Sequence, residues 1–499
     1  MPLLWCSPNF TTQESVVSFE KAIDSNPYLS TLVNRFDLAD YKSEIVDRNT
    51  RSMKQFANLR SLHLPASTSL DSLDLDHMQH LEEITDLNVE LSMQGLTRMA
   101  TILSSKKFQK IGLTFQSGTS PLDLTILSSI PTLSNVVSLS MAFGSDLGLD
   151  LLRHLLTKFP NLDSFEINSK YTPRCIVALL AESCPRITKL SLGTFSGLGE
   201  EYLDDLCRDL ELHYSRQLRE FSIYFFNDWP IYSERFTRSL FKSFYNVETL
   251  RLSGIRLNNA IVQNLAESLS SKIKTLELTC VSYRDIFADE PWSNLFARVG
   301  PRLKNLVLVR GCLPPNIGKS IAQHCPILED LTLACTNIAD ASVAWVAQTC
   351  GRRLRHLDVS DTNITKVGLR YVFQYCSGLQ NLSLAKLSSQ LELGGGFEVF
   401  LAQYGRQLLH LDLSFQTIGD QLLYAIGRHA RGLRELAFTD QPGINDHAVS
   451  SVMSNCRKLK RLSVRRYSRT SHSISQEMLD TVDQHFVHMD LSHRDPKRF

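Results

Sequence analysis

The sequence predicts an α/β solenoid in which one short strand and one helix alternate through about 18 repeats. Two observations carry this prediction. Apolar residues spaced as L-x-x-L-x-L occur 18 times, and successive first positions lie 24 to 31 residues apart. The segments between these patterns have apolar residues at the i, i+3, i+4 and i+7 spacing of one helical face. A period of this kind is typical of stacked units that bury one continuous core.

The L-x-x-L-x-L pattern predicts the strands. Six clean examples are Leu328-Leu331-Leu333, Leu354-Leu357-Val359, Leu379-Leu382-Leu384, Leu408-Leu411-Leu413, Leu433-Leu436-Phe438 and Leu459-Leu462-Val464. The same spacing fits with first positions at Val33, Leu59, Ile84, Phe108, Val136, Leu162, Ile187, Leu218, Val247, Ile273, Leu303 and Phe486. Leucine-rich repeats have this pattern and a period of about 20–29 residues, so the predicted unit lies at the long end.

Helices are predicted between the strands. One example has Val343, Val346, Ala347 and Cys350 on a single face, and three later repeats share the pattern. Asp340, Asp420 and Asp446 stand three residues before the first apolar position of their repeats. We expect each of these aspartates to cap the start of its own helix.

The spacing of the two kinds of element predicts the shape. Parallel strands lie about 4.8 Å apart, whereas packed helices need about 8–10 Å. Stacking both in one repeat therefore curves the solenoid, with a parallel sheet on the inner face and helices outside. We expect a right-handed horseshoe over residues 33–499, preceded by an N-terminal cap over residues 1–32.

Composition excludes several classes of function. Lys and Arg total 53 and Asp and Glu total 52, so the net charge of +1 is too small to attract nucleic acid or an anionic membrane, and neither is predicted as a partner. No apolar run of about 18 residues is present, and the first residues lack the regions of a signal peptide. The 11 cysteines include no C-x-x-C pair. Reduced thiols in a cytoplasmic or nuclear protein are expected.

The cysteines and the N-terminal stretch resemble a known family. Cys184, Cys325, Cys350, Cys376 and Cys456 each stand three or four residues before the next strand pattern. Cys325-Pro326-Ile327-Leu328, followed by Ile338-Ala339-Asp340, resembles the cysteine-containing leucine-rich repeats that are typical of F-box proteins. The stretch from Pro2-Leu3-Leu4-Trp5 through Phe10, with Ser18-Phe19 and then Asn26-Pro27-Tyr28-Leu29 through Leu38, is similar to the segment that follows the F-box in many fungal members.

This resemblance implies a function. F-box proteins of this kind are substrate-recognition receptors of SCF-type cullin-RING ubiquitin ligases, and they act in ubiquitin-dependent protein degradation. The resemblance therefore implies a target protein on the concave face, with a Skp-type adaptor and cullin as partners if an F-box is supplied upstream. No F-box precedes the matching stretch, so the module either lies upstream of Met1 or was lost. The alternative is a free-standing scaffold or a small-GTPase regulator on a similar horseshoe.

Polar pairs that flank a core residue are the first candidate site. In His356-Leu357-Asp358, His410-Leu411-Asp412 and His488-Met489-Asp490, both polar side chains project onto the concave face. Metal binding or acid–base chemistry competes there with a solvated polar surface, since equivalent positions elsewhere hold Thr275 and Glu277 or Asn381 and Ser383. We predict partner contact by His356, Asp358, His410 and Asp412.

No catalytic residue, metal ligand or cofactor is predicted. Zinc needs clustered ligands, whereas these cysteines are about 25 residues apart and are expected to be buried structural thiols. Gly394-Gly395-Gly396 lacks the Lys and Ser/Thr of a phosphate-binding loop and predicts a flexible turn.

Basic residues concentrate near the C-terminal end of the solenoid, from Arg457 to Arg469. The strand pattern places Arg461 and Arg465 on the concave face. The default interpretation is a solvated surface, and the functional alternative is a site for an acidic or phosphorylated partner peptide. Nucleic acid is the least favoured interpretation, because Tyr467 is the only interleaved aromatic residue.

Aromatic residues gather in two insertions that follow strands. The insertions are expected to form loops at the rim of the concave face, where aromatic clusters mark interface anchors. The alternative is that they pack onto the solenoid and cover an irregular repeat. The predicted rim contacts are Tyr224, Phe226, Trp229 and Tyr232 in the first insertion, and Tyr283 and Trp292 in the second.

Overall fold

The chain forms two compact units, Met1–Val247 and Glu248–Phe499. The computed structural model describes residues 21–23, 25, 28, 31, 33, 35–37, 58–64, 85–91, 108–115, 130–143, 149–169, 175–193, 200–224, 234–255, 257–280, 287–387, 393–466 and 473–485.

The first unit is built on a ladder of parallel strands, each paired with the next in sequence. The strands are β1 (Arg35–Asp37), β2 (Ser61–Leu64), β3 (Asp86–Leu91), β4 (Lys110–Phe115), β5 (Ser138–Phe143), β6 (Ser164–Ser169), β7 (Lys189–Gly193) and β8 (Glu220–Tyr224). Four described helices follow β5 and later strands: α7 (Leu149–Leu156), α8 (Ile176–Ser183), α9 (Glu200–His213) and α10 (Glu234–Lys242). Residues 21–23 and 25, before β1, are also helical.

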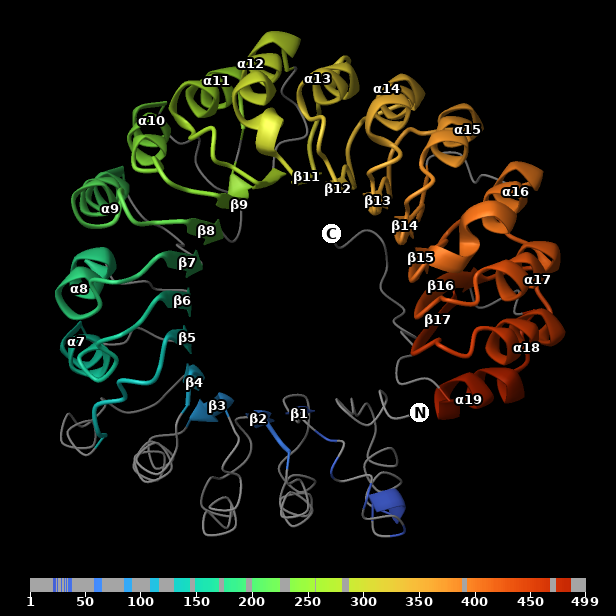
Figure 1. Ribbon diagram of the computed structural model, residues 1–499, viewed down its shortest axis with the longest axis horizontal. Coiled ribbons are helices and arrows are strands. Elements are labelled where there is room, and N and C mark those ends of the chain that lie inside the picture. The colour runs from blue at the N-terminus through green and yellow to red at the C-terminus, as the bar shows by residue number, and fades with distance from the viewer. Residues whose placement is uncertain are drawn as a thin grey trace. The chain divides into compact units, whose positions relative to one another are not determined.

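The second unit repeats the arrangement with nine parallel strands, and Figure 1 shows its helices outside and its strands on the inner side. The strands are β9 (Thr249–Ile255), β10 (Thr275–Cys280), β11 (Asn305–Val309), β12 (Asp330–Thr332), β13 (His356–Asp358), β14 (Asn381–Ser383), β15 (His410–Asp412), β16 (Glu435–Asp440) and β17 (Arg461–Arg466). The helices are α11 (Asn259–Ser268), α12 (Asp289–Val299), α13 (Ile317–His324), α14 (Asp340–Cys350), α15 (Lys366–Tyr375), α16 (Gly395–Tyr404), α17 (Asp420–His429), α18 (Asp446–Asn455) and α19 (Gln476–His485), with short 3-10 turns η3 (Gly300–Arg302) and η4 (Gly405–Gln407).

A stripe of leucines explains why the strands stack. One leucine of each strand from β11 to β17 faces its counterpart in register, and all are buried: Leu306, Leu331, Leu357, Leu382, Leu411, Leu436 and Leu462. Each buried leucine contributes about 1.5–3 kcal/mol. The first position of each predicted pattern is also buried wherever it is described, from Val33 to Leu459.

The fold is therefore a leucine-rich-repeat solenoid, as the sequence predicts. Seventeen of the 18 predicted strands lie in the described residues, and the last pattern, from Phe486, lies outside them. The division into a cap over 1–32 and a solenoid over 33–499 stays a prediction. At Gly394–Gly396 the prediction of a flexible turn is wrong, since Gly395 and Gly396 form the first turn of α16.

The buried cysteines connect the end of one helix to the repeat before it. The Sγ of Cys350 donates to the carbonyl of Cys325 at 3.4 Å, and the Sγ of Cys456 donates to the carbonyl of Ala430 at 3.5 Å. The Sγ of Cys184 makes the equivalent bond to the carbonyl of Phe159 at 3.4 Å. Burial raises the pKa of Cys184 to about 12 and that of Cys456 to about 11. These thiols are structural, as expected.

The helix starts differ from the prediction in an informative way. Asp340 is the first residue of α14, but its carboxylate does not cap that helix. Instead it accepts hydrogen bonds from the next helix start, from Thr365 N at 2.7 Å, Thr365 Oγ1 at 2.6 Å and Gly368 N at 2.9 Å. Asp420 binds Asn445 before α18 in the same way, and Asp446 accepts from Ser475 N before α19 at 2.9 Å. Each aspartate thus orders the helix of the following repeat.

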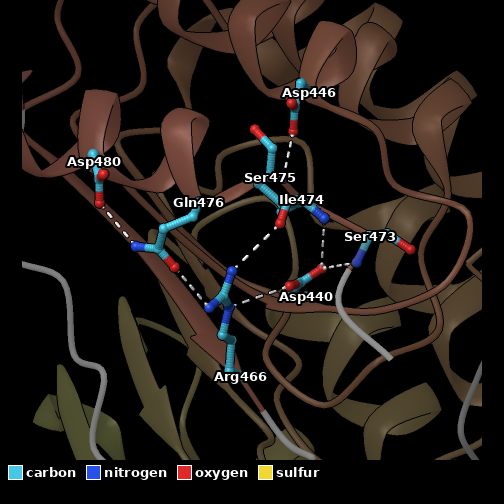
Figure 2. Close-up of polar contacts among 8 residues, drawn as sticks. All are labelled: Asp440, Asp446, Arg466, Ser473, Ile474, Ser475, Gln476 and Asp480. Atoms are coloured by element: carbon cyan, nitrogen blue, oxygen red, sulfur yellow. Dashed lines mark hydrogen bonds and ion pairs between the residues drawn. The ribbon is translucent and has the colours of Figure 1, made fainter. Parts of the chain in front are cut away.

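The last helix is fastened by a buried ion pair. Arg466 Nε lies 3.5 Å from Asp440 Oδ2, and the Asp440 side chain is fully buried. Figure 2 shows both side chains reaching the segment before α19: Arg466 donates to the carbonyl of Ile474 and to Gln476 Oε1, while Asp440 accepts from the backbone of Ser473 and Ile474. The guanidinium and carboxylate together hold α19 on the end of the second unit.

Candidate functional site

The inner face of the second unit presents two columns of polar side chains. In β12 to β15 the middle residue is the buried leucine, so the residues on either side point away from the core. The first column is Asp330, His356, Asn381, His410, Glu435 and Arg461, and the second is Thr332, Asp358, Ser383, Asp412, Ala437 and Ser463. Neighbours in a column lie about 4.8 Å apart, so they form one continuous surface.

A groove of about 560 Å³ lies over the five strands β13 to β17. Small side chains in the second column, at Ser383, Ala437 and Ser463, leave room for it. Of the predicted concave contacts, the structure brings His356, His410, Asp412, Arg461 and Arg465 together in its lining. Asp358 lies beside it in the second column. The lining also includes Asn381, Ser383, Glu435 and Ser463, which we did not predict as contacts.

A row of His, Glu and Arg side chains crosses three neighbouring strands of this groove. Glu435 Oε2 lies 3.1 Å from His410 Nδ1 and 3.2 Å from Arg461 Nη1. These side chains are between one third and one half exposed, so water screens the pairs and each contributes under about 1 kcal/mol. The row holds His410 and Arg461 in place, and the Glu435 carboxylate is occupied by these two contacts.

Two aspartates of the second column, Asp358 and Asp412, also accept hydrogen bonds from the turn that follows their strand. Asp358 Oδ1 accepts from Ser360 N at 2.9 Å and from Ser360 Oγ at 2.6 Å. Asp412 Oδ1 accepts from Ser414 N at 2.8 Å. One oxygen of each carboxylate therefore closes the turn at the end of its strand.

A residue that follows each of the strands β12 to β15 has a left-handed backbone. Cys335, Asp361, Lys386 and Phe415 have φ of 56°, 54°, 51° and 63°. Phe415 is the bulkiest of them, and this conformation costs such a residue about 1–2 kcal/mol. Its backbone N–H donates to Thr439 Oγ1 at 2.8 Å, and the guanidinium carbon of Arg465 lies 5.9 Å from its ring centroid. Phe415 thus provides a platform that orients Arg465.

Three polar atoms of the groove lining are buried without a hydrogen-bond partner among the described residues. They are Asn381 Oδ1, Ser463 Oγ and Arg465 Nε. Ser463 is only 8% exposed. Buried polar atoms are usually paired, so these three atoms are hydrogen-bonding capacity that the described residues leave unused.

The predicted aromatic rim is corrected at Trp292. Trp292 lies in α12 and is fully buried, with Phe287 and Phe296 against its ring. It is therefore a core residue of its repeat and not a loop anchor. Tyr224 ends β8 and is partly exposed. Phe226, Trp229, Tyr232 and Tyr283 lie outside the described residues.

The comparisons with known proteins report distant likenesses. No family model matches the chain. A chain of the Rad7 and Elc1 complex of yeast is similar, with 14% identity, a TM-score of 0.46, and coverage of 94% of this chain and 96% of that one. The internalin InlF of Listeria monocytogenes has 13% identity, a TM-score of 0.35, and coverage of 92% and 96%. The TLR13–ssRNA13 complex has 14% identity, a TM-score of 0.39, and coverage of 86% of this chain and 57% of that one.

Within the described ranges, no group of three or more His, Cys, Asp or Glu side chains is placed to hold a metal ion. None of the described helices has the length and apolar run needed to cross a bilayer.

Proposed function

We propose that this chain is a non-enzymatic protein-binding receptor, which holds a segment of a partner protein in the groove over β13 to β17. The observation that carries this proposal is the groove itself, lined by inward side chains of five consecutive strands. Five strands about 4.8 Å apart span about 19 Å, the length of about six residues of extended chain. A rigid ladder that presents varied polar side chains suits recognition of such a segment.

We further propose that the receptor supplies targets to a cullin-RING ubiquitin ligase. Support for this comes from the resemblance of the cysteine-containing repeats and the N-terminal stretch to F-box proteins. The receptor positions its target, and ubiquitin transfer is done by other subunits. It works in the cytoplasm or nucleus, where the nine free cysteines of the described residues stay reduced.

The groove is tested by filling it. Ala437→Trp places an indole in the hollow of the second column, whereas Val399→Trp places the same ring on the outer face of α16, where Val399 is 57% exposed. We expect Ala437→Trp to abolish capture of partner proteins from cell extract, measured by affinity purification and mass spectrometry. Val399→Trp should leave the captured set unchanged. Equal capture by both variants would remove the groove from the proposal.

The ligase association is tested separately. The chain, alone and with any upstream-encoded extension, is mixed with purified Skp-type adaptor and cullin in a pull-down. Binding by either form is the expected result. If neither form binds, the protein is a free-standing scaffold or a small-GTPase regulator.

A further inference from the structure

The β17 end of the groove has hydrogen-bonding capacity that the described residues leave unused. Ser463 and Arg465 are alternate residues of β17, so their side chains lie on the same face, about 7 Å apart along the strand. Ser463 Oγ and Arg465 Nε are both buried and unpaired among the described residues. A buried donor left without an acceptor costs about 1–3 kcal/mol, so a bound acceptor at this end is favoured.

The neighbouring carboxylates do not supply that acceptor. Glu435 is engaged by His410 on one side and by Arg461 on the other. Among the described residues, Asp412 forms no ion pair with Arg461 or Arg465, and one of its oxygens closes its own turn. Positive charge therefore dominates at β17, and negative charge dominates toward β13 and β15.

We propose that the β17 end of the groove is an anion subsite, in which Arg465, Ser463 and Arg461 bind a carboxylate or phosphate group of the partner segment. This inference rests on the proposed function, since it names the chemistry of the segment that the groove holds. The planar guanidinium of Arg465 offers two parallel N–H donors to such a group, and its carbon lies 5.9 Å from the centroid of the Phe415 ring. Ala437, on the neighbouring strand, leaves the space that the group occupies.

The same charge pattern gives the bound segment a direction. An acidic or phosphorylated residue lies over β17, and a donor or basic residue lies over β13 to β15, near Asp358 and Asp412. A segment with the reverse order would put like charges together at both ends.

The experiment uses the full chain and defined probes. The probes are inorganic phosphate and three blocked hexapeptides that differ only in one end residue: phosphoserine, Glu or Gln. We expect the wild-type chain to bind the phosphoserine or Glu hexapeptide about tenfold more tightly than the Gln hexapeptide, in calorimetry at low salt. Preference for phosphoserine identifies the group as phosphate, and equal binding of Glu identifies it as any carboxylate or phosphate.

Substitutions place the site. Arg465→Gln should remove the preference and the binding of inorganic phosphate, and Arg465→Lys should keep only part of it. Arg457→Gln is the matched control, because Arg457 is an exposed cation in the turn before β17 and does not line the groove. It should change the affinities by less than about twofold. Ser463→Ala removes an unpaired hydroxyl, so it should weaken anion binding without lowering the unfolding temperature.

The proposal is overturned if Arg465→Gln keeps the preference, or if Arg457→Gln loses it to the same extent. Failure here is distinguishable from failure of the receptor function. Partner capture that Ala437→Trp abolishes but Arg465→Gln leaves intact contradicts only the anion subsite. If anion binding depends on Arg465 but Ala437→Trp leaves partner capture unchanged, only the receptor function is contradicted.

Discussion

Asp340 begins one helix, yet its carboxylate serves the start of the next. This arrangement depends on Gly368, because a Cβ there would lie 2.5 Å from Asp340 Oδ1. Gly368 has the negative φ of ordinary helical backbone. Glycine is needed there because the Asp340 carboxylate approaches closely, and not because the dihedral angle is unusual. One missing methyl group thus allows a hydrogen bond between repeats.

Gly368→Ala should therefore lower the free energy of unfolding by about 1–3 kcal/mol, because the new methyl displaces the Asp340 carboxylate from Gly368 N and Thr365 N. Guanidinium unfolding followed by circular dichroism measures the change. Gly395→Ala is the matched control, since nothing lies within 4 Å of its added Cβ. It should raise stability by up to about 1 kcal/mol. Equal losses in both variants would show that Asp340 contributes nothing.

At Trp292 the sequence contains two signals that point to different structures, the helical spacing of apolar residues and the density of aromatics. Trp292, Leu295, Phe296 and Val299 are all buried and have the helical spacing i, i+3, i+4 and i+7. That spacing was in the sequence, but the density of aromatics favoured a loop, and the prediction for Trp292 is wrong. The ion pair of Arg466 with Asp440 could also be predicted from the sequence. Asp440 stands 26 residues earlier, one repeat away, and the two residues are register partners. Opposite charges at equivalent positions of adjacent repeats predict such a pair.

At the scale of elements, α19 differs from the other helices in how it is held. A polar network from β16 and β17 reaches it across the segment before its first turn (Figure 2). Removing one member of a buried ion pair leaves the other charge without compensation. The stability of α19 is therefore tied to two strand residues.

Arg466→Met should destabilise the second unit by about 3–5 kcal/mol, because the fully buried Asp440 carboxylate loses its cation. Hydrogen exchange by mass spectrometry should show faster exchange in residues 476–485. The control is Arg461→Met on the same strand, whose pair with Glu435 is solvent-exposed and should cost under about 1 kcal/mol. Unchanged exchange in α19 would contradict the fastening role of Arg466.

At the scale of the whole molecule, the cysteines form a set that recurs through both units. Burial raises the pKa of Cys184 and of Cys376 to about 12 from an ordinary value of 9.0. The pKa values of Cys207, Cys325 and Cys350 are also raised by burial. In the unfolded chain these thiols lose their protons above about pH 9, whereas in the folded chain they keep them.

The free energy of unfolding should consequently be insensitive to these thiols below about pH 9 and fall as the pH rises from there toward about 12. Each thiol adds a slope of about 1.4 kcal/mol per pH unit within that window. Guanidinium unfolding at pH 8, 9 and 10 measures the slope. Cys184→Ala should make this slope shallower by the contribution of one thiol. An identical slope in that variant would show that Cys184 ionises equally in the folded and unfolded chain.

The fold was predictable to a greater extent than the site, for a physical reason. A buried leucine must recur in every repeat, so the pattern from Leu328 to Leu459 reports the ladder directly. Inward polar positions carry no such constraint. The sequence places His356, His410 and Arg461 on the correct face, but it does not show that Glu435 engages two of them or that Ser463 lacks a partner. Those facts depend on contacts between repeats.

The acidic or amide residue at a helix start has a consequence for how the second unit opens. Such residues link α11 to α12 through Asn259, α12 to α13 through Asp289, α14 to α15 through Asp340, and α17 to α19 in two steps through Asp420 and Asp446. The first residues of α13, α15 and α16 are Ile317, Lys366 and Gly395, which have no side-chain acceptor to offer. These side-chain bonds group the helix starts of α11 to α13, of α14 and α15, and of α17 to α19, and we expect the helices within a group to open together.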